Sequence, residues 1–103
     1  MILYVAGPMT GIADKNIPAF DVAERRLTAR GYTVLSPARH ESAEVTHWRD
    51  YMRLGIKDVC ECEGIALLPG WEHSAGARLE STVGEMIGAE VKPITYWLNR
   101  GPS

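Results

Sequence analysis

Short apolar segments alternate with longer segments of helical periodicity, and this alternation limits the possible folds more than any other feature of the chain. Ile2–Ala6 is an almost continuous apolar run that ends at Gly-Pro, which is typical of a strand buried on both faces. Further strands are expected at residues 32–37, 64–69 and 90–97, and helices at residues 18–31, 47–62 and 74–89. Elements in this order form parallel β-α-β units with right-handed connections. The sequence therefore predicts an α/β fold, a small flavodoxin- or Rossmann-like three-layer sandwich with a mainly parallel sheet of roughly four to five strands.

The expected helices carry their own start, stop and face signals. Pro18 suits the first turn of the first helix, Gly31 suits its end, and Thr46 can cap the second helix. Apolar residues at helical spacing mark the buried faces: Phe20, Ala23 and Leu27 in the first helix, and Met52, Ile56 and Val59 in the second. Pro93 indicates that the last strand lies at a sheet edge or is irregular. A chain of 103 residues is expected to form one domain, residues 1–98, followed by a short tail at residues 99–103.

Composition excludes several classes of partner. Basic and acidic residues are mixed along a chain of net charge -2, so there is no basic surface for a nucleic acid polymer. No apolar stretch approaches the roughly 20 residues that span a bilayer, and the N-terminus lacks the basic region of a signal peptide. We therefore expect a cytoplasmic protein that binds neither a nucleic acid polymer nor a membrane.

The sequence also carries no recognisable metal or cofactor motif. Cys60 and Cys62 have no second cysteine pair and no histidine at ligand spacing, so reduced thiols are expected and a metal site is not. The turn at residues 7–11, "GPMTG", matches neither the dinucleotide fingerprint nor a P-loop. No cofactor is therefore expected.

Two loops are expected to form a ligand site. In open parallel sheets ligands bind beyond the carboxyl ends of the strands, where the strand order reverses. This rule selects "GPMTG" after the first strand and "PGWEHSAG" after the third. Gly7 and Gly11 let backbone N–H groups approach a ligand closely, although a simple tight turn explains them equally well. In the second loop, Ser74 can cap a helix or present its hydroxyl to a phosphate, and Trp71 can stack on a base or simply cover the sheet end.

Glu80 is the strongest candidate for a site residue. If Leu79, Val83, Met86 and Ile87 define the core side of the third helix, Glu80 lies about 60° from that direction, beside Gly76. Ser81, Arg78 and Glu85 then face solvent. A partly buried carboxylate next to a helix start can support cleavage of an N-glycosidic bond through an oxocarbenium-like state. Such cleavage commonly uses a second acid, and spacing does not distinguish among the candidates Asp50, Asp58, Glu61, Glu63 and Glu72.

Longer stretches of the chain resemble a known family. These are "YVAGPMTG", the N-x-P-A-F pattern at residues 16–20, "WRDYMR" and "ALLPGWEHSAGARLE". They are similar to the nucleoside 2-deoxyribosyltransferase-like proteins, in particular to the DUF4406 branch that is frequent in phages and prophages. The resemblance covers essentially the whole chain.

The resemblance implies a set of site residues. In the pattern Ser74-x-Gly76-x-x-x-Glu80, Glu80 would be the nucleophile and Ser74 would hold a 5′-phosphate or hydroxyl. The residues expected to bind the nucleoside or nucleotide are Tyr4, Gly7, Pro8, Met9, Gly11, Asn16, Trp71, Ser74 and Gly76. Related enzymes often carry an aspartate where this chain has Gly55. Asp58, one turn away, is the expected substitute, and Gly55 is expected to enlarge the pocket.

Three functions remain open at this point. The first is an enzyme that cleaves or exchanges an N-glycosidic bond through Glu80, and the second is a non-catalytic protein that sequesters a nucleotide. A carboxylate within reach of Glu80 favours the enzyme, whereas an open basic or aromatic pocket favours the binder. Residues that can furnish such a pocket, or equally a solvated surface, are Arg39, His40, Trp48, Arg49 and Arg53. The third is a structural protein, for which Glu80 would face solvent. A homo-oligomer is expected, with Tyr96 and Trp97 either in a subunit contact or in the chain's own core.

Overall fold

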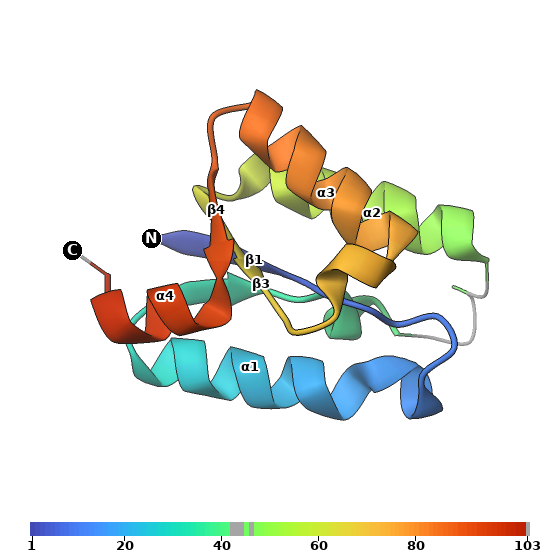
Figure 1. The fold of residues 1–103 in the computed structure, drawn as a ribbon, viewed down its shortest axis with the longest axis horizontal. Coiled ribbons are helices and arrows are strands. Elements are labelled where there is room, and N and C mark those ends of the chain that lie inside the picture. Colours follow the sequence, from blue (N-terminus) through green and yellow to red (C-terminus); the bar gives the residue numbers. More distant parts are fainter. Residues whose placement is uncertain (42–44, 46, 103) are drawn as a thin grey trace.

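The chain forms a parallel β-sheet between two layers of helices (Figure 1). The structure, a computed structural model, describes residues 1–41, 45 and 47–102. Within these ranges the strands are β1 (Ile2–Ala6), β2 (Thr33–Leu35), β3 (Gly64–Leu67) and β4 (Glu90–Pro93). The helices are α1 (Ile17–Ala29), α2 (Trp48–Glu61), α3 (Ala75–Met86) and α4 (Ile94–Arg100). Short 3-10 turns occur at Ala13–Asn16, Pro37–His40 and Trp71–His73. The predicted α/β three-layer fold is confirmed.

The strand order β2-β1-β3-β4 places β1 at the point where the order reverses. Every pairing is parallel, and Tyr4 of β1 lies opposite Leu35 of β2 and Ile65 of β3. Side chains alternate along β1: Leu3 and Val5 pack in a core with residues of α1 and α4, whereas Tyr4 and Ala6 pack in a core with residues of α2 and α3. The two faces of this one strand thus belong to two separate cores.

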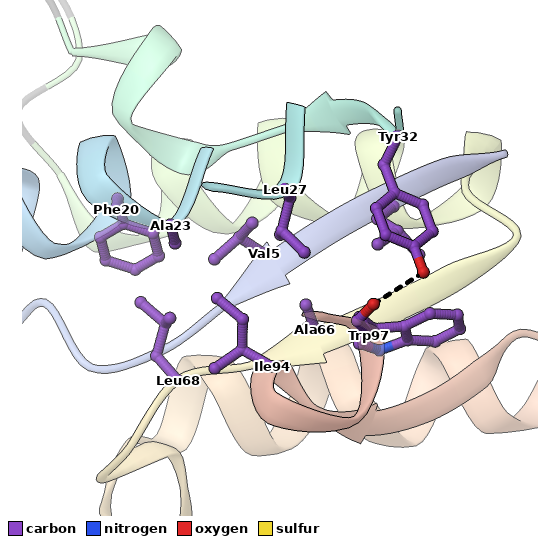
Figure 2. Close-up of a cluster of buried hydrophobic side chains, with 10 residues drawn as sticks. Val5, Phe20, Ala23, Leu27, Tyr32, Ala66, Leu68, Ile94 and Trp97 are labelled. Atoms are coloured by element: carbon purple, nitrogen blue, oxygen red, sulfur yellow. Dashed lines mark hydrogen bonds between the residues drawn. The ribbon is translucent and has the colours of Figure 1, made fainter. Parts of the chain in front are cut away.

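Trp97 is the largest side chain of the core beneath α1 and α4. Its indole Nε1 donates to the carbonyl of Ile65 over 2.9 Å, and its own carbonyl accepts from the Tyr32 hydroxyl over 2.8 Å. Figure 2 shows the apolar side chains around it. They include the three predicted for the buried face of the first helix: Phe20, Ala23 and Leu27. Trp97 is therefore a core residue and does not offer a subunit contact.

The prediction of a strand through residues 90–97 is wrong, because β4 ends at Pro93 and a helix begins at Ile94. Proline has no N–H to continue the strand ladder, and it is well tolerated next to the first turn of a helix. Ile94 and Trp97, three residues apart, are the buried face of α4. This helix continues to Arg100, two residues into the predicted tail.

The second helix begins at Trp48, with His47 at the N-cap position and no side-chain cap. Thr46, the predicted cap, lies outside the described residues. Of its predicted apolar face, Val59 is buried, and Met52 and Ile56 are half-buried. No helix in the described ranges has the length and apolar character needed to cross a membrane.

Candidate active site

A pocket of about 350 Å³ opens beyond the carboxyl ends of β1 and β3, at the predicted position. Its volume lies within the usual range of small-molecule sites. The lining residues come from the loop after β1, from α2 and from the first turns of α3, together with Pro37. They are Gly7, Met9, Thr10, Gly11, Ile12, Lys15, Pro37, Trp48, Tyr51, Met52, Ser74, Gly76, Ala77 and Glu80.

Glu80 is a buried carboxylate that lines this pocket. Its residue is only 6% exposed, and Oε2 accepts a 2.5 Å hydrogen bond from the hydroxyl of Tyr4 on β1. Burial raises the pKa of Glu80 to about 7. The hydrogen bond from Tyr4 opposes this rise, and the negative charge of Asp58 adds to it. Glu80 is therefore a carboxylic acid that ionises near neutral pH at the wall of a cavity.

Glu80 is buried for a different reason from the one predicted. Leu79, Met86 and Ile87, taken as the core side of α3, are 45%, 82% and 50% exposed. Ser81, expected in solvent, is buried. The buried face consists of small residues around Glu80: Gly76, Ala77, Ser81 and Gly84. Small residues let α3 approach the sheet closely, and a Cβ at Gly84 would overlap the side chain of Ile65.

Gly55 does not enlarge the pocket, contrary to expectation. A Cβ at this position would overlap Oε2 of Glu80 and lie 2.9 Å from the Tyr4 hydroxyl oxygen. The space left by the missing side chain is therefore filled by the hydrogen-bonded Glu80–Tyr4 pair. The absence of a side chain at Gly55 on α2 thus leaves room for the buried carboxylate of Glu80 on α3.

Asp58, the predicted second catalytic carboxylate, is bound elsewhere. Its residue is 3% exposed, with Oδ1 at 2.6 Å from a guanidinium nitrogen of Arg39 and Oδ2 at 2.7 Å from Nε2 of His40. It is not among the residues that line the pocket. Arg39 and His40 therefore pair with Asp58, and none of these three residues lines the pocket. Arg49 and Arg53 lie beside a separate shallow hollow on the outer side of α2 and α3.

The loop after β1 contributes backbone and one cation to the pocket. Of the residues expected to bind the ligand, Gly7, Met9 and Gly11 line the pocket, whereas Tyr4, Pro8 and Asn16 do not. The side-chain amide of Asn16 instead donates to the carbonyl of Pro8 over 2.9 Å, which fixes the loop. Asp14, Lys15 and Asn16 are three consecutive residues in the left-handed region, with φ of 54°, 53° and 62°. Each such residue costs on the order of 1 kcal/mol or more.

The loop after β3 supplies a helix cap and a glycine. The Ser74 hydroxyl accepts from the backbone N–H of Ala77 over 3.1 Å, so Ser74 caps α3. Ser74 also lines the pocket. A Cβ at Gly76 would lie 2.9 Å from the sulfur of Met52, so this glycine lets α2 and α3 approach each other. Trp71 is half-buried, packs against the core on the α2 and α3 side, and does not line the pocket.

Most of the α2 residues that line the pocket were not predicted from the sequence. Trp48, Tyr51 and Met52 lie at positions i, i+3 and i+4, so they share one face of the helix and line the pocket together. Only Trp48 was a candidate, as part of an alternative pocket. Thr10, Ile12 and Lys15 were also missed. The helical spacing of Trp48, Tyr51 and Met52 in "WRDYM" predicts that they share one face, and this pattern could have identified the α2 side of the pocket.

The cysteines are free thiols, Cys60 exposed and Cys62 half-buried. Burial raises the pKa of Cys62 to about 11, which keeps this thiol protonated. Within the described ranges, no three side chains of the metal-binding types come together.

The parallel sheet with helices on both faces defines a Rossmann-type α/β fold. More specifically, the chain belongs to the DUF4406 family, described as a domain of unknown function, whose model matches residues 1–93. The fold is similar to that of a 2-deoxyribosyltransferase from the psychrotolerant bacterium Bacillus psychrosaccharolyticus, with a TM-score of 0.69 and 18% sequence identity. The match covers 88% of this chain and 69% of the other. No curated protein matches the sequence.

Proposed function

We propose that this protein binds a nucleoside or nucleotide in the pocket and cleaves or exchanges its N-glycosidic bond through Glu80. The observation that carries this proposal is the position of the Glu80 carboxylate, buried at the pocket wall and held by Tyr4. The similarity in fold adds support, because the structural relative is described as a 2-deoxyribosyltransferase that is a suitable biocatalyst for the synthesis of nucleosides.

The proposed reaction has two steps. Ionised Glu80 attacks the anomeric carbon as the glycosidic C–N bond breaks, and the electron pair of that bond leaves with the base. The Tyr4 hydroxyl binds Oε2, which leaves Oε1 for the attack. Water then displaces the glutamate in hydrolysis, or a second base does so in transfer. Because Glu80 is the only carboxylate among the described lining residues, the departing base takes its proton from water.

The shape and chemistry of the walls suit a nucleobase. Trp48 offers an aromatic face from α2, and Met9 and Ile12 offer apolar side chains from the loop after β1. A flat base can stack against such an aromatic side chain. Glu80 then remains available to the sugar.

A second candidate function is nucleotide sequestration without turnover. Asp58 is bound by Arg39 and His40 and does not line the pocket, so the described lining residues include no second carboxylate to act with Glu80. The same pocket has an aromatic wall and a lysine, which are features of a binding protein. Both functions use the same ligand class and differ only in whether the bond is cut.

A homo-oligomer is part of the proposal. Leu79, Met86 and Ile87 are exposed apolar side chains of α3, and exposed apolar groups of this kind are common at subunit contacts. Light scattering coupled to size-exclusion chromatography measures the mass in solution. A mass of one chain at all concentrations would contradict this part.

The test compares wild type, Glu80→Gln and the control Glu85→Gln, which alters an exposed residue on the same helix. Each protein is incubated with nucleosides and nucleotides, and free base is measured by chromatography while binding is measured by calorimetry. Base release by wild type and Glu85→Gln, but not by Glu80→Gln, supports the enzyme. Binding with every ligand recovered intact supports sequestration, and the absence of binding overturns both.

A further inference from the structure

Lys15 brings a positive charge to the rim of the pocket. It is the only cation among the described lining residues, and Glu80 is the only anion. Lys15 Nζ donates to the Tyr51 hydroxyl over 2.9 Å and lies 3.3 Å from Oε1 of Glu41. The Lys15–Tyr51 contact thus joins the loop after β1 to α2 across one side of the pocket.

The backbone fixes this position of Lys15 at a cost. Lys15 is the middle one of the three left-handed residues, and the next of them, Asn16, is tied to Pro8. Nothing about an ordinary solvated lysine requires such a conformation. Strained backbone of this kind gathers at ligand clamps and active sites. The turn therefore presents Lys15 to the pocket.

The present partner of Lys15 is easily replaced. The Lys15 and Glu41 side chains are 48% and 43% exposed, and ion pairs this accessible to water are weak. The Tyr51 hydroxyl donates to Glu41 over 2.5 Å and can turn to another anion. A phosphate monoester carries more charge than a carboxylate and offers three acceptor oxygens. Thr10 also lines the pocket, and its hydroxyl can serve as a third donor.

We propose that the ligand is a 5′-mononucleotide and that Lys15, Tyr51 and Thr10 bind its phosphate in place of the Glu41 carboxylate. This inference rests on the proposed function for the nucleoside part of the ligand. The phosphate lies toward the loop after β1 and away from Glu80 on α3, because two negative charges repel each other. The anomeric carbon, on the other side of the sugar, is then directed to Glu80.

The experiment measures the affinity of matched pairs, each a nucleoside and its 5′-monophosphate, by calorimetry. Wild type and the Glu80→Gln variant are both titrated, so that turnover does not consume the ligand in one of them. We expect wild type to prefer the monophosphate by roughly tenfold or more, since charge-assisted hydrogen bonds are strong. Lys15→Gln removes most of this preference, because it weakens monophosphate binding far more than nucleoside binding. Glu41→Gln increases monophosphate affinity severalfold, because a competing carboxylate is lost.

Lys57→Gln is the matched control, since Lys57 is exposed on α2 and does not line the pocket. It leaves all affinities unchanged. If nucleosides and monophosphates bind equally well, or if Lys15→Gln has no effect on the difference, the phosphate subsite is wrong and the proposed function stands. If neither ligand binds to either protein, the proposed function itself fails.

Discussion

The hydroxyl of Tyr4 and the carboxylate of Glu80, 76 residues apart in the chain, form a 2.5 Å hydrogen bond between the central strand and α3. Burial, followed by the nearby charge of Glu80, raises the pKa of Tyr4 well above its ordinary value of 10.0. Tyr4 is therefore a permanent donor, and Glu80 is the group of the pair that changes its charge near neutral pH. The following predictions depend on this pair and on its neighbours on α2.

Tyr4→Phe removes the one hydrogen bond that lowers the pKa of Glu80. The pKa of Glu80 therefore rises, and the acid limb of the kcat/KM profile shifts to higher pH, because the nucleophile must be ionised. The pH dependence of base release checks this. A lower rate with an unshifted acid limb would show that Tyr4 does not set the pKa of Glu80.

Glu80→Gln is expected to stabilise the fold at alkaline pH. The usual pKa of glutamate is 4.5, and in the folded protein it is about 7. Between these values the unfolded chain has lost the proton and the native protein has kept it, so the stability of wild type falls as pH rises. The loss reaches roughly 3 kcal/mol above pH 7, and Gln, which has no charge, avoids it.

Urea unfolding at several pH values measures this difference. Glu80→Gln exceeds wild type clearly at about pH 8 and by less than roughly 1 kcal/mol at about pH 5. The exposed control Glu85→Gln shows no such pH-dependent gain. An equal difference at both pH values would mean that Glu80 has the same pKa in the folded and the unfolded protein.

Gly55→Ala is expected to destabilise the protein, although alanine favours a helix by about 1 kcal/mol over glycine. The new Cβ would overlap the Glu80 carboxylate, so the side chain must leave its place beside Tyr4. Thermal unfolding checks this, together with loss of base release. In a Glu80→Ala background the overlap with the carboxylate is gone, and the double-mutant cycle should show that most of the cost disappears.

The packing of α3 shows the limit of what could be predicted from the sequence. Local patterns were sufficient for the fold, because apolar strands and helical spacing such as that of Phe20, Ala23 and Leu27 are readable from the chain. The orientation of α3 could not be predicted from local patterns, because this helix packs through Gly76, Ala77 and Gly84 while its large apolar residues stay exposed. Small residues carry little hydrophobic signal, yet they decide how closely a helix approaches a sheet.

The candidate site was predictable only where one loop or helix start determines a contact. Gly7, Ser74 and Glu80 belong to such local patterns, and all three line the pocket. Lys15 and Tyr51 meet only because the loop after β1 folds against α2, 36 residues further along the chain. Asp58 was a reasonable candidate by spacing, but its pairing with Arg39 and His40 depends on a tertiary contact with the turn after β2.

Asp58→Asn distinguishes a positioning role for Asp58 from a role as general acid. Asn cannot balance Arg39 and His40, so stability falls by about 1–3 kcal/mol. Burial is the main cause of the raised pKa of Glu80, and the negative charge of Asp58, which adds to it, is lost at the same time. The acid limb of kcat/KM therefore shifts to lower pH, opposite to the shift expected for Tyr4→Phe.

Base release as a function of pH is the measurement, and Asp21→Asn, the same change at an exposed position on α1, is the control. A general acid would behave differently, because its removal abolishes the alkaline limb and lowers kcat by roughly 10²–10⁴-fold. Asp58 is held 2.6 Å from Arg39 and 2.7 Å from His40 and does not line the pocket. We therefore expect kcat of the folded variant at saturating pH to remain within about tenfold of wild type, and a larger loss would place Asp58 in the reaction itself.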